Sequence, residues 1–136
     1  MVIQFSPKEK VLIVEETLEI RNEIERLLTE KNLTCLTAAS ISEAIEILKT
    51  RNNLIEVNLM FYGLSLNKNE DILALQRLQN KAPGVPIVIM IDSSQKNQTG
   101  PFLKKNIKDY LLKPINSEKL FRTVKSLIIP NRDFNY

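Results

Sequence analysis

Several residue types that build common functional sites are scarce in this chain of 136 residues. It has no histidine and a single cysteine, Cys35. Zinc sites, haem sites and histidine-based catalytic triads need more of these side chains, so they are excluded. One cysteine cannot form an internal disulfide, which fits a reducing compartment. We interpret Cys35 as a small buried apolar residue.

Glycine and long apolar runs are also scarce. Three glycines leave no glycine-rich loop for phosphate, and no nucleophile stands beside a base, so an enzyme is not expected. The longest apolar run, Val85 to Ile91, is far shorter than the ~20 residues of a membrane span. The N-terminus lacks the basic and apolar pattern of a signal peptide. We therefore expect a cytoplasmic protein that does not cross a membrane.

The composition is that of a soluble globular protein, with 43% hydrophobic and 26% charged residues. The length predicts a single domain over residues 1–136, with its core at about 10–129 and short tails at 1–9 and 130–136. The net charge of +3 is uneven, because residues 101–136 hold eight basic and three acidic side chains. This surplus suits an acidic partner or nucleic acid, although a surface of solvated lysines accounts for it more simply.

Apolar strand-like runs alternate with helical patterns along the chain. The runs are Val11–Val14, Leu33–Leu36, Leu54–Met60, Pro86–Ile91 and Tyr110–Leu112. Between the second and third runs, Ser40 and Glu43 form a capping box that opens a helix. Five repeats of strand and helix predict an α/β fold, with a five-stranded parallel sheet flanked by helices on both faces.

The fourth helical segment is predicted to be short or frayed. Gly100 and Pro101 stand in the middle of the stretch where the alternation places it. A proline inside a helix costs ~3 kcal/mol or more, whereas a proline in the first turn is tolerated. We therefore expect this helix to begin near Pro101 and to end near Asn106.

Two adjacent acids, Glu15 and Glu16, directly follow the first apolar run. Ligands of parallel sheets bind beyond the carboxyl ends of the strands, so this pair is expected at a candidate site. Paired carboxylates suit a hard cation such as Mg²⁺. Acids at the start of a helix are equally well explained by the helix dipole, and both interpretations stay open on this pattern alone.

Over about Lys10 to Ile129 the pattern resembles the receiver domain of two-component response regulators, the CheY-like family with a flavodoxin-like fold. Glu15 and Glu16 match the family's acidic pair after the first strand. Lys113 and the proline after it, in the segment DYLLKPINSEKL, match the Lys-Pro after the fifth strand. Tyr110 matches the family's aromatic switch position.

Two other family positions are not matched. The phosphoacceptor aspartate at the end of the third strand falls on Phe61, and the following loop is about two residues longer than usual. The hydroxyl residue at the end of the fourth strand falls on Ile91, followed by Asp92 in place of a small residue. Phenylalanine supplies neither the nucleophile nor a metal ligand for phosphoryl transfer. The resemblance therefore implies a degenerate pseudo-receiver without a cofactor, in which Glu15 and Glu16 hold Mg²⁺ weakly at most.

From this resemblance we predict a phosphorylation-independent protein-interaction module of two-component type. Its partner would be a histidine kinase, an output domain or another signalling protein, and Lys113 would offset the acidic pair by pairing with Glu16 or Asp92. Receivers often dimerise through the face made by the fourth helix, fifth strand and fifth helix, which is basic here. The basic residues of this face are Lys104, Lys105, Lys108, Lys119, Arg122 and Lys125.

The main alternative is a receiver that is phosphorylated, with Mg²⁺, on a displaced acidic residue. Glu56 lies at the wrong end of the third strand, Asp71 opens the third helix, and Asp92 belongs to the fourth strand. None of these is expected to have the required geometry. Nucleic-acid binding by the basic C-terminal third is not expected either, because few aromatic side chains accompany the lysines.

Overall fold

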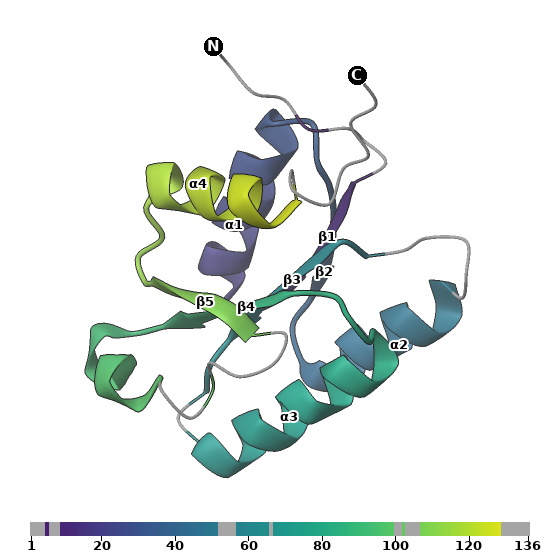
Figure 1. The fold of residues 1–136 in the computed structure, drawn as a ribbon, viewed down its shortest axis with the longest axis vertical. Coiled ribbons are helices and arrows are strands. Elements are labelled where there is room, and N and C mark those ends of the chain that lie inside the picture. The colour runs from purple at the N-terminus through teal and green to yellow at the C-terminus, as the bar shows by residue number, and fades with distance from the viewer. Residues whose placement is uncertain are drawn as a thin grey trace.

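The protein is represented by a computed structural model, which describes residues 5, 9–51, 57–65, 67–99, 102 and 107–128. Its elements in chain order are β1 (Lys10–Val14), α1 (Leu18–Glu30), β2 (Thr34–Ala38), α2 (Ile41–Arg51), β3 (Leu59–Gly63), α3 (Lys68–Lys81), β4 (Ile87–Ile91), the 3₁₀-helix η1 (Ser93–Gln98), β5 (Ile107–Leu112) and α4 (Ser117–Ile128). The five strands form one parallel sheet in the order β2-β1-β3-β4-β5. Helices α1 and α4 cover one face, and α2 and α3 cover the other (Figure 1). The predicted fold is confirmed.

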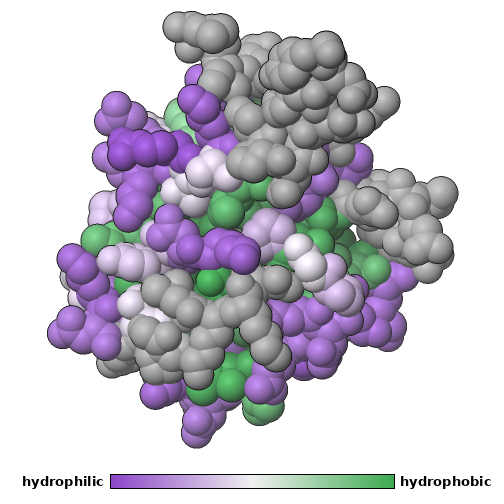
Figure 2. All heavy atoms as spheres, in the orientation of Figure 1, coloured by the Kyte–Doolittle hydropathy of each residue, from purple (hydrophilic) through white to green (hydrophobic). Residues whose placement is uncertain are grey.

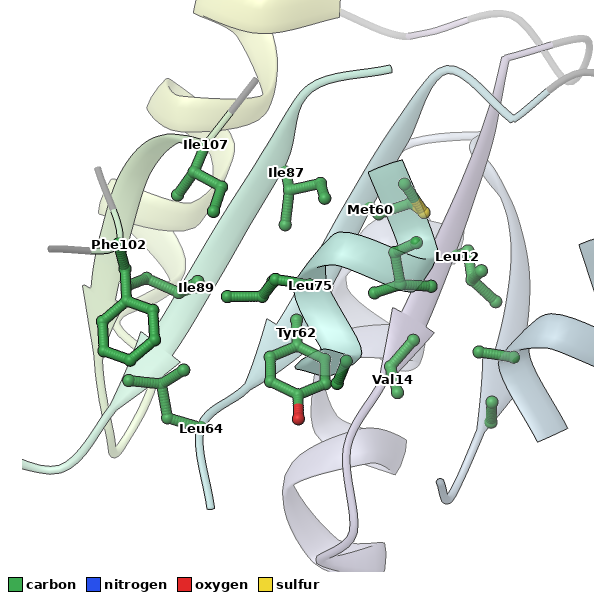
Figure 3. Close-up of a cluster of buried hydrophobic side chains, with 14 of the residues drawn as sticks. Leu12, Val14, Met60, Tyr62, Leu64, Leu75, Ile87, Ile89, Phe102 and Ile107 are labelled. Atoms are coloured by element: carbon green, nitrogen blue, oxygen red, sulfur yellow. The ribbon is translucent and has the colours of Figure 1, made fainter. Parts of the chain in front are cut away.

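The central strands are apolar throughout because both of their faces are covered. Along β3, alternate side chains enter two separate core clusters. Met60 and Tyr62 pack with α2 and α3, in the cluster shown in Figure 3. Leu59 and Phe61 pack with α1 and α4 on the opposite face.

Side-chain caps fix the starts of three helices. Half of the capping box predicted for α2 is confirmed, because the hydroxyl of Ser40 accepts from the backbone N–H of Glu43 at 3.2 Å. The Glu43 carboxylate in turn accepts from the backbone N–H of Ala39. Asn67 caps α3 and Asn116 caps α4 through their side-chain oxygens, at 3.1 and 2.9 Å.

The third strand begins and ends later than predicted. It runs over Leu59–Gly63 instead of Leu54–Met60, and residues 54–56 lie outside the described part of the chain. The pairing of Val14 with Tyr62 and of Gly63 with Met90 extends the ladder to Gly63. The connection between β3 and α3 is therefore shorter than the sequence indicated.

The described part of the fourth helical segment is short and begins earlier than predicted. It is the six-residue 3₁₀-helix η1, which precedes Gly100 and is started by Asp92. The backbone N–H of Asp92 donates to Oε1 of Gln95, and the backbone N–H of Gln95 donates to the carbonyl of Asp92, both at 2.9 Å. The expected stretch from Pro101 to Asn106 lies, except for Phe102, outside the described residues.

On the face that Figure 2 shows, the described residues are mostly hydrophilic, with hydrophobic side chains between them. Within the described ranges, no helix is both long enough and apolar enough to cross a membrane.

Candidate functional site

Glu15 lies at the carboxyl end of β1, where its side chain is only 3% exposed. Its backbone N–H donates to the carbonyl of Ala38 at 3.0 Å, which continues the pairing of β1 with β2 by one residue. The side-chain oxygen Oε2 accepts from the backbone N–H of Thr17 at 2.9 Å. Arg21 donates to the Glu15 carbonyl at 2.7 Å. These contacts turn the carboxylate inward, at the edge of the sheet where ligands of parallel folds bind.

Lys113 approaches the same carboxylate from β5. Its backbone N–H donates to the carbonyl of Ile91 at 2.8 Å, and its Nζ lies 2.8 Å from Oε1 of Glu15. The two opposite charges form an ion pair, although their geometry is not that of a hydrogen bond. The expected cation is therefore present, but it pairs with Glu15, whereas Glu16 and Asp92, the two expected partners, are exposed. The Lys113–Pro114 peptide bond is cis.

Gly63, at the end of β3, borders this ion pair. A Cβ atom placed on Gly63 would overlap Oε1 of Glu15 and would lie 2.9 Å from its Cδ and 3.4 Å from Nζ of Lys113. The space beside the end of β3 is therefore filled by the ion pair, and only glycine fits there with Glu15 in this position. Sequence reasoning missed this residue. A glycine in a strand is nevertheless a known sign of close approach by another group.

Phe61 does not border the ion pair of Glu15 and Lys113, so the position predicted for it in the site is wrong. Its side chain is fully buried, with 0% exposure, in the cluster beneath α1 and α4. Residues 61 and 63 point to the same face of the sheet because side chains alternate with a period of two. Phe61 therefore lies one repeat of about 6.6 Å deeper than Gly63. Ile91 is also fully buried and packs in the cluster beneath α2 and α3.

Comparison with known proteins identifies the family. The model of the response regulator receiver domain matches residues 11–125. The chain belongs to this family. Members of the family are signalling modules of two-component systems that interact with kinases and output domains.

Relatives and solved structures agree with this assignment. A probable transcriptional regulator, ycf27 of Porphyridium aerugineum, is 27% identical over 121 residues, which is 89% of this receiver and 48% of that protein. The chain thus spans about half the length of this relative. A receiver domain protein from Clostridium thermocellum has a TM-score of 0.76 at 20% identity and covers 90% of this chain and 95% of its own. A response regulator from Thermotoga maritima has a TM-score of 0.76 at 21% identity, and the match covers 89% of this chain and 98% of that one.

A second polar cluster of the receiver joins β3 to the start of α3. Asp71, in the first turn of α3, is 1% exposed and accepts from the Tyr62 hydroxyl at 2.9 Å. The backbone N–H of Ser65 donates to both oxygens of Asp71, at 3.0 and 3.1 Å. Burial and the negative charge of Asp71 both raise the pKa of the Tyr62 phenol, burial being the larger cause. Figure 3 shows Tyr62 with its hydroxyl toward the carboxyl ends of the strands.

An open cavity of about 480 Å³ lies beside these groups, between the end of β1 and helices α2 and α3. Its charged and hydroxyl-bearing lining residues are Glu15, Glu16, Ser40, Ser65, Glu70 and Arg77, together with Tyr62. Across the described ranges, no three carboxylate, cysteine or histidine side chains are grouped so as to hold a metal ion.

Tyr110, which the sequence predicts at the family's switch position, is half-buried on β5. The Nζ atom of Lys119 lies 5.1 Å from the centre of its ring, which is a cation–π contact. On the expected interaction face Lys108, Arg122 and Lys125 are exposed. The remaining two residues of that face, Lys104 and Lys105, lie outside the described residues.

Proposed function

We propose that this receiver acts as a pseudo-receiver, an interaction module that works without aspartyl phosphorylation. The observation that carries the proposal is the overlap that any Cβ on Gly63 would make with Glu15. In the family, the phosphoacceptor aspartate stands at the end of the third strand, near the lysine that follows the fifth. In this chain the residue beside Lys113 at that end is a glycine, and a neighbouring carboxylate fills the space.

The chemistry of phosphoryl transfer supports this proposal. The reaction needs an accessible nucleophile in line with the phosphoryl group, and a metal ion that neutralises the developing charge. The Glu15 carboxylate is buried and is occupied by Lys113 and by the backbone N–H of Thr17. Asp71 is occupied by Tyr62 and Ser65. Each oxygen of the two carboxylates already contacts a donor or a cation, so neither carboxylate suits the role of a displaced nucleophile.

The partner surface in this proposal is the basic face of β5 and α4. Lys108, Arg122 and Lys125 are exposed there, and they would attract an acidic surface of a histidine kinase, an output domain or another signalling protein. A second copy of this chain is a further candidate for this surface. Lys119 makes a cation–π contact with the ring of Tyr110 on the same face, and this contact would favour one position of the ring.

The test is the intact mass of the protein after incubation with acetyl phosphate and Mg²⁺. A family receiver that has the phosphoacceptor aspartate, treated in parallel, shows that the reagents are active. We expect this chain to gain no phosphoryl mass. A gain that is lost on Asp92→Asn or Asp71→Asn would instead support phosphorylation on a displaced acid.

A further inference from the structure

Two loops at the carboxyl edge of the sheet are joined by the side chain of Gln95. This residue belongs to η1, follows β4 and is only 7% exposed. Its Nε2 donates to the carbonyl of Ser65, in the loop after β3, at 2.8 Å. Its Oε1 accepts from the backbone N–H of Asp92 at 2.9 Å. One amide thus caps its own helix and reaches across to the neighbouring loop.

The far side of this link is anchored in the core. Ser65 donates its backbone N–H to Asp71, and Asp71 accepts from the hydroxyl of Tyr62 on β3. Hydrogen bonds to an ionised acceptor are stronger than those between neutral groups, and this carboxylate is almost completely shielded from water. The loop after β3 is therefore held on one side by the sheet and on the other by Gln95.

We propose that Tyr62, Asp71, Ser65 and Gln95 form a lock, here called the loop bridge, that holds the segment after β4 in one position without a phosphoryl group. A 3₁₀-helix has poor hydrogen-bond geometry, so η1 depends on outside contacts for its order. The sheet ladder ends at Gly63 and Met90, with one further bond from the N–H of Leu64 to the Met90 carbonyl. The loop bridge continues the link between the two chain segments beyond that point.

This inference extends the proposed function, and the role given to the loop bridge rests on that proposal. A receiver that is not phosphorylated needs another means of presenting a constant surface next to β5, and η1 leads from β4 to β5. The loop bridge supplies this with neutral and charged groups of the chain itself. Its geometry can be tested without a phosphodonor or a partner, so the two ideas can fail separately.

The test is hydrogen exchange of residues 92–99, measured by mass spectrometry in the wild type and in Gln95→Glu. Glutamate keeps an oxygen that accepts from the N–H of Asp92, but it cannot donate to the carbonyl of Ser65. We expect exchange in this segment to become roughly three to ten times faster, as the loss of one hydrogen bond implies. Gln76→Glu, on the exposed side of α3, adds the same charge and serves as the matched control.

The other end of the loop bridge supplies a second, independent variant. Tyr62→Phe removes the hydroxyl that donates to Asp71 and should also speed exchange of residues 92–99. In the Gln95→Glu background it should add little, because the link it acts through is already broken. Exchange of β1 in the same samples reports any loosening of the whole fold. The proposal is overturned if Gln95→Glu leaves residues 92–99 unchanged, if both effects add in full, or if β1 accelerates equally.

Discussion

Oε1 of Glu15 lies 2.8 Å from Nζ of Lys113, and the two groups together fill the space that a side chain on Gly63 would need. This relationship joins the ends of β1, β3 and β5 through one buried ion pair. It also gives a physical reason for the coexistence of three features: an inward-turned glutamate, a glycine at the end of a strand and a largely buried lysine. The carboxylate of Glu15 has room because residue 63 lacks a side chain, and Lys113 offsets its charge.

Lys113→Met should destabilise the fold. The substitution keeps most of the apolar stem but leaves the Glu15 carboxylate, 3% exposed, without its cation. Removal of one partner of a buried ion pair costs about 3 kcal/mol or more. Urea unfolding followed by circular dichroism measures this change. Lys125→Met, at an exposed position of α4, is the matched control. The double variant Glu15→Gln with Lys113→Met should recover part of the lost stability.

Gly63→Ala should also destabilise, for a steric reason. Its Cβ would overlap the Glu15 carboxylate, which would have to leave its contacts with Lys113 and with the backbone N–H of Thr17, at a cost of about 1–3 kcal/mol. The same substitution should be much less harmful in the Glu15→Ala background, where the space is empty. Thermal melts of the two single variants and the double variant measure the coupling. Strictly additive effects would mean that Glu15 is not the group that excludes a side chain from this position.

Phe61→Ala distinguishes a core position from a pocket position. Truncation of a fully buried phenylalanine costs about 3–5 kcal/mol, because it leaves a cavity among the residues of the α1 and α4 cluster. A side chain that lined an open pocket would lose far less. Urea unfolding is again the measurement, and Phe121→Ala, at a half-buried position of α4, provides a milder comparison.

Cys35 should react slowly with thiol reagents. It is half-buried on the edge strand β2, less buried than the sequence suggested, and burial raises its pKa from the ordinary 9.0 to about 11. The thiolate is the reactive form, so alkylation by iodoacetamide should rise with pH around 11 in the folded protein and around 9.0 in urea. The Cys35 thiol keeps its proton to a higher pH in the folded state than in the unfolded state. Its contribution to stability is therefore complete below pH 9.0 and is lost as the pH rises through about 11. Equal midpoints in both states would contradict this.

The sheet could be predicted from sequence because its strands are covered on both faces. Runs such as Val11–Val14 and Pro86–Ile91 are apolar at every position, which is typical of strands inside a parallel sheet. The same uniformity hid the register of β3. With Leu59 to Tyr62 all apolar, no polar residue marked which side chain comes last at the edge, and a two-residue shift preserves the facing of every side chain.

The site was predicted in part for a related reason. Glu15 and Lys113 stand out in the sequence because charges directly follow apolar runs. The acid that pairs with the lysine is decided by side-chain direction, which the sequence does not show. The side chain of Glu15 is buried, whereas that of Glu16 is exposed. The pairing of Tyr62 with Asp71 could not be foreseen, because it depends on how the loop after β3 returns to α3.

The most direct test of the central claim is a ¹H–¹⁵N spectrum recorded with and without Mg²⁺ and beryllofluoride, a mimic of the phosphoryl group. If the ion pair of Glu15 and Lys113 fills the site, the signals of Gly63, Lys113 and residues 92–99 should not move beyond the effect of Mg²⁺ alone. Specific shifts at Gly63 and Lys113 that extend to Tyr110 would contradict the claim, because they would mean that the pocket accepts a phosphoryl group and transmits its presence to β5.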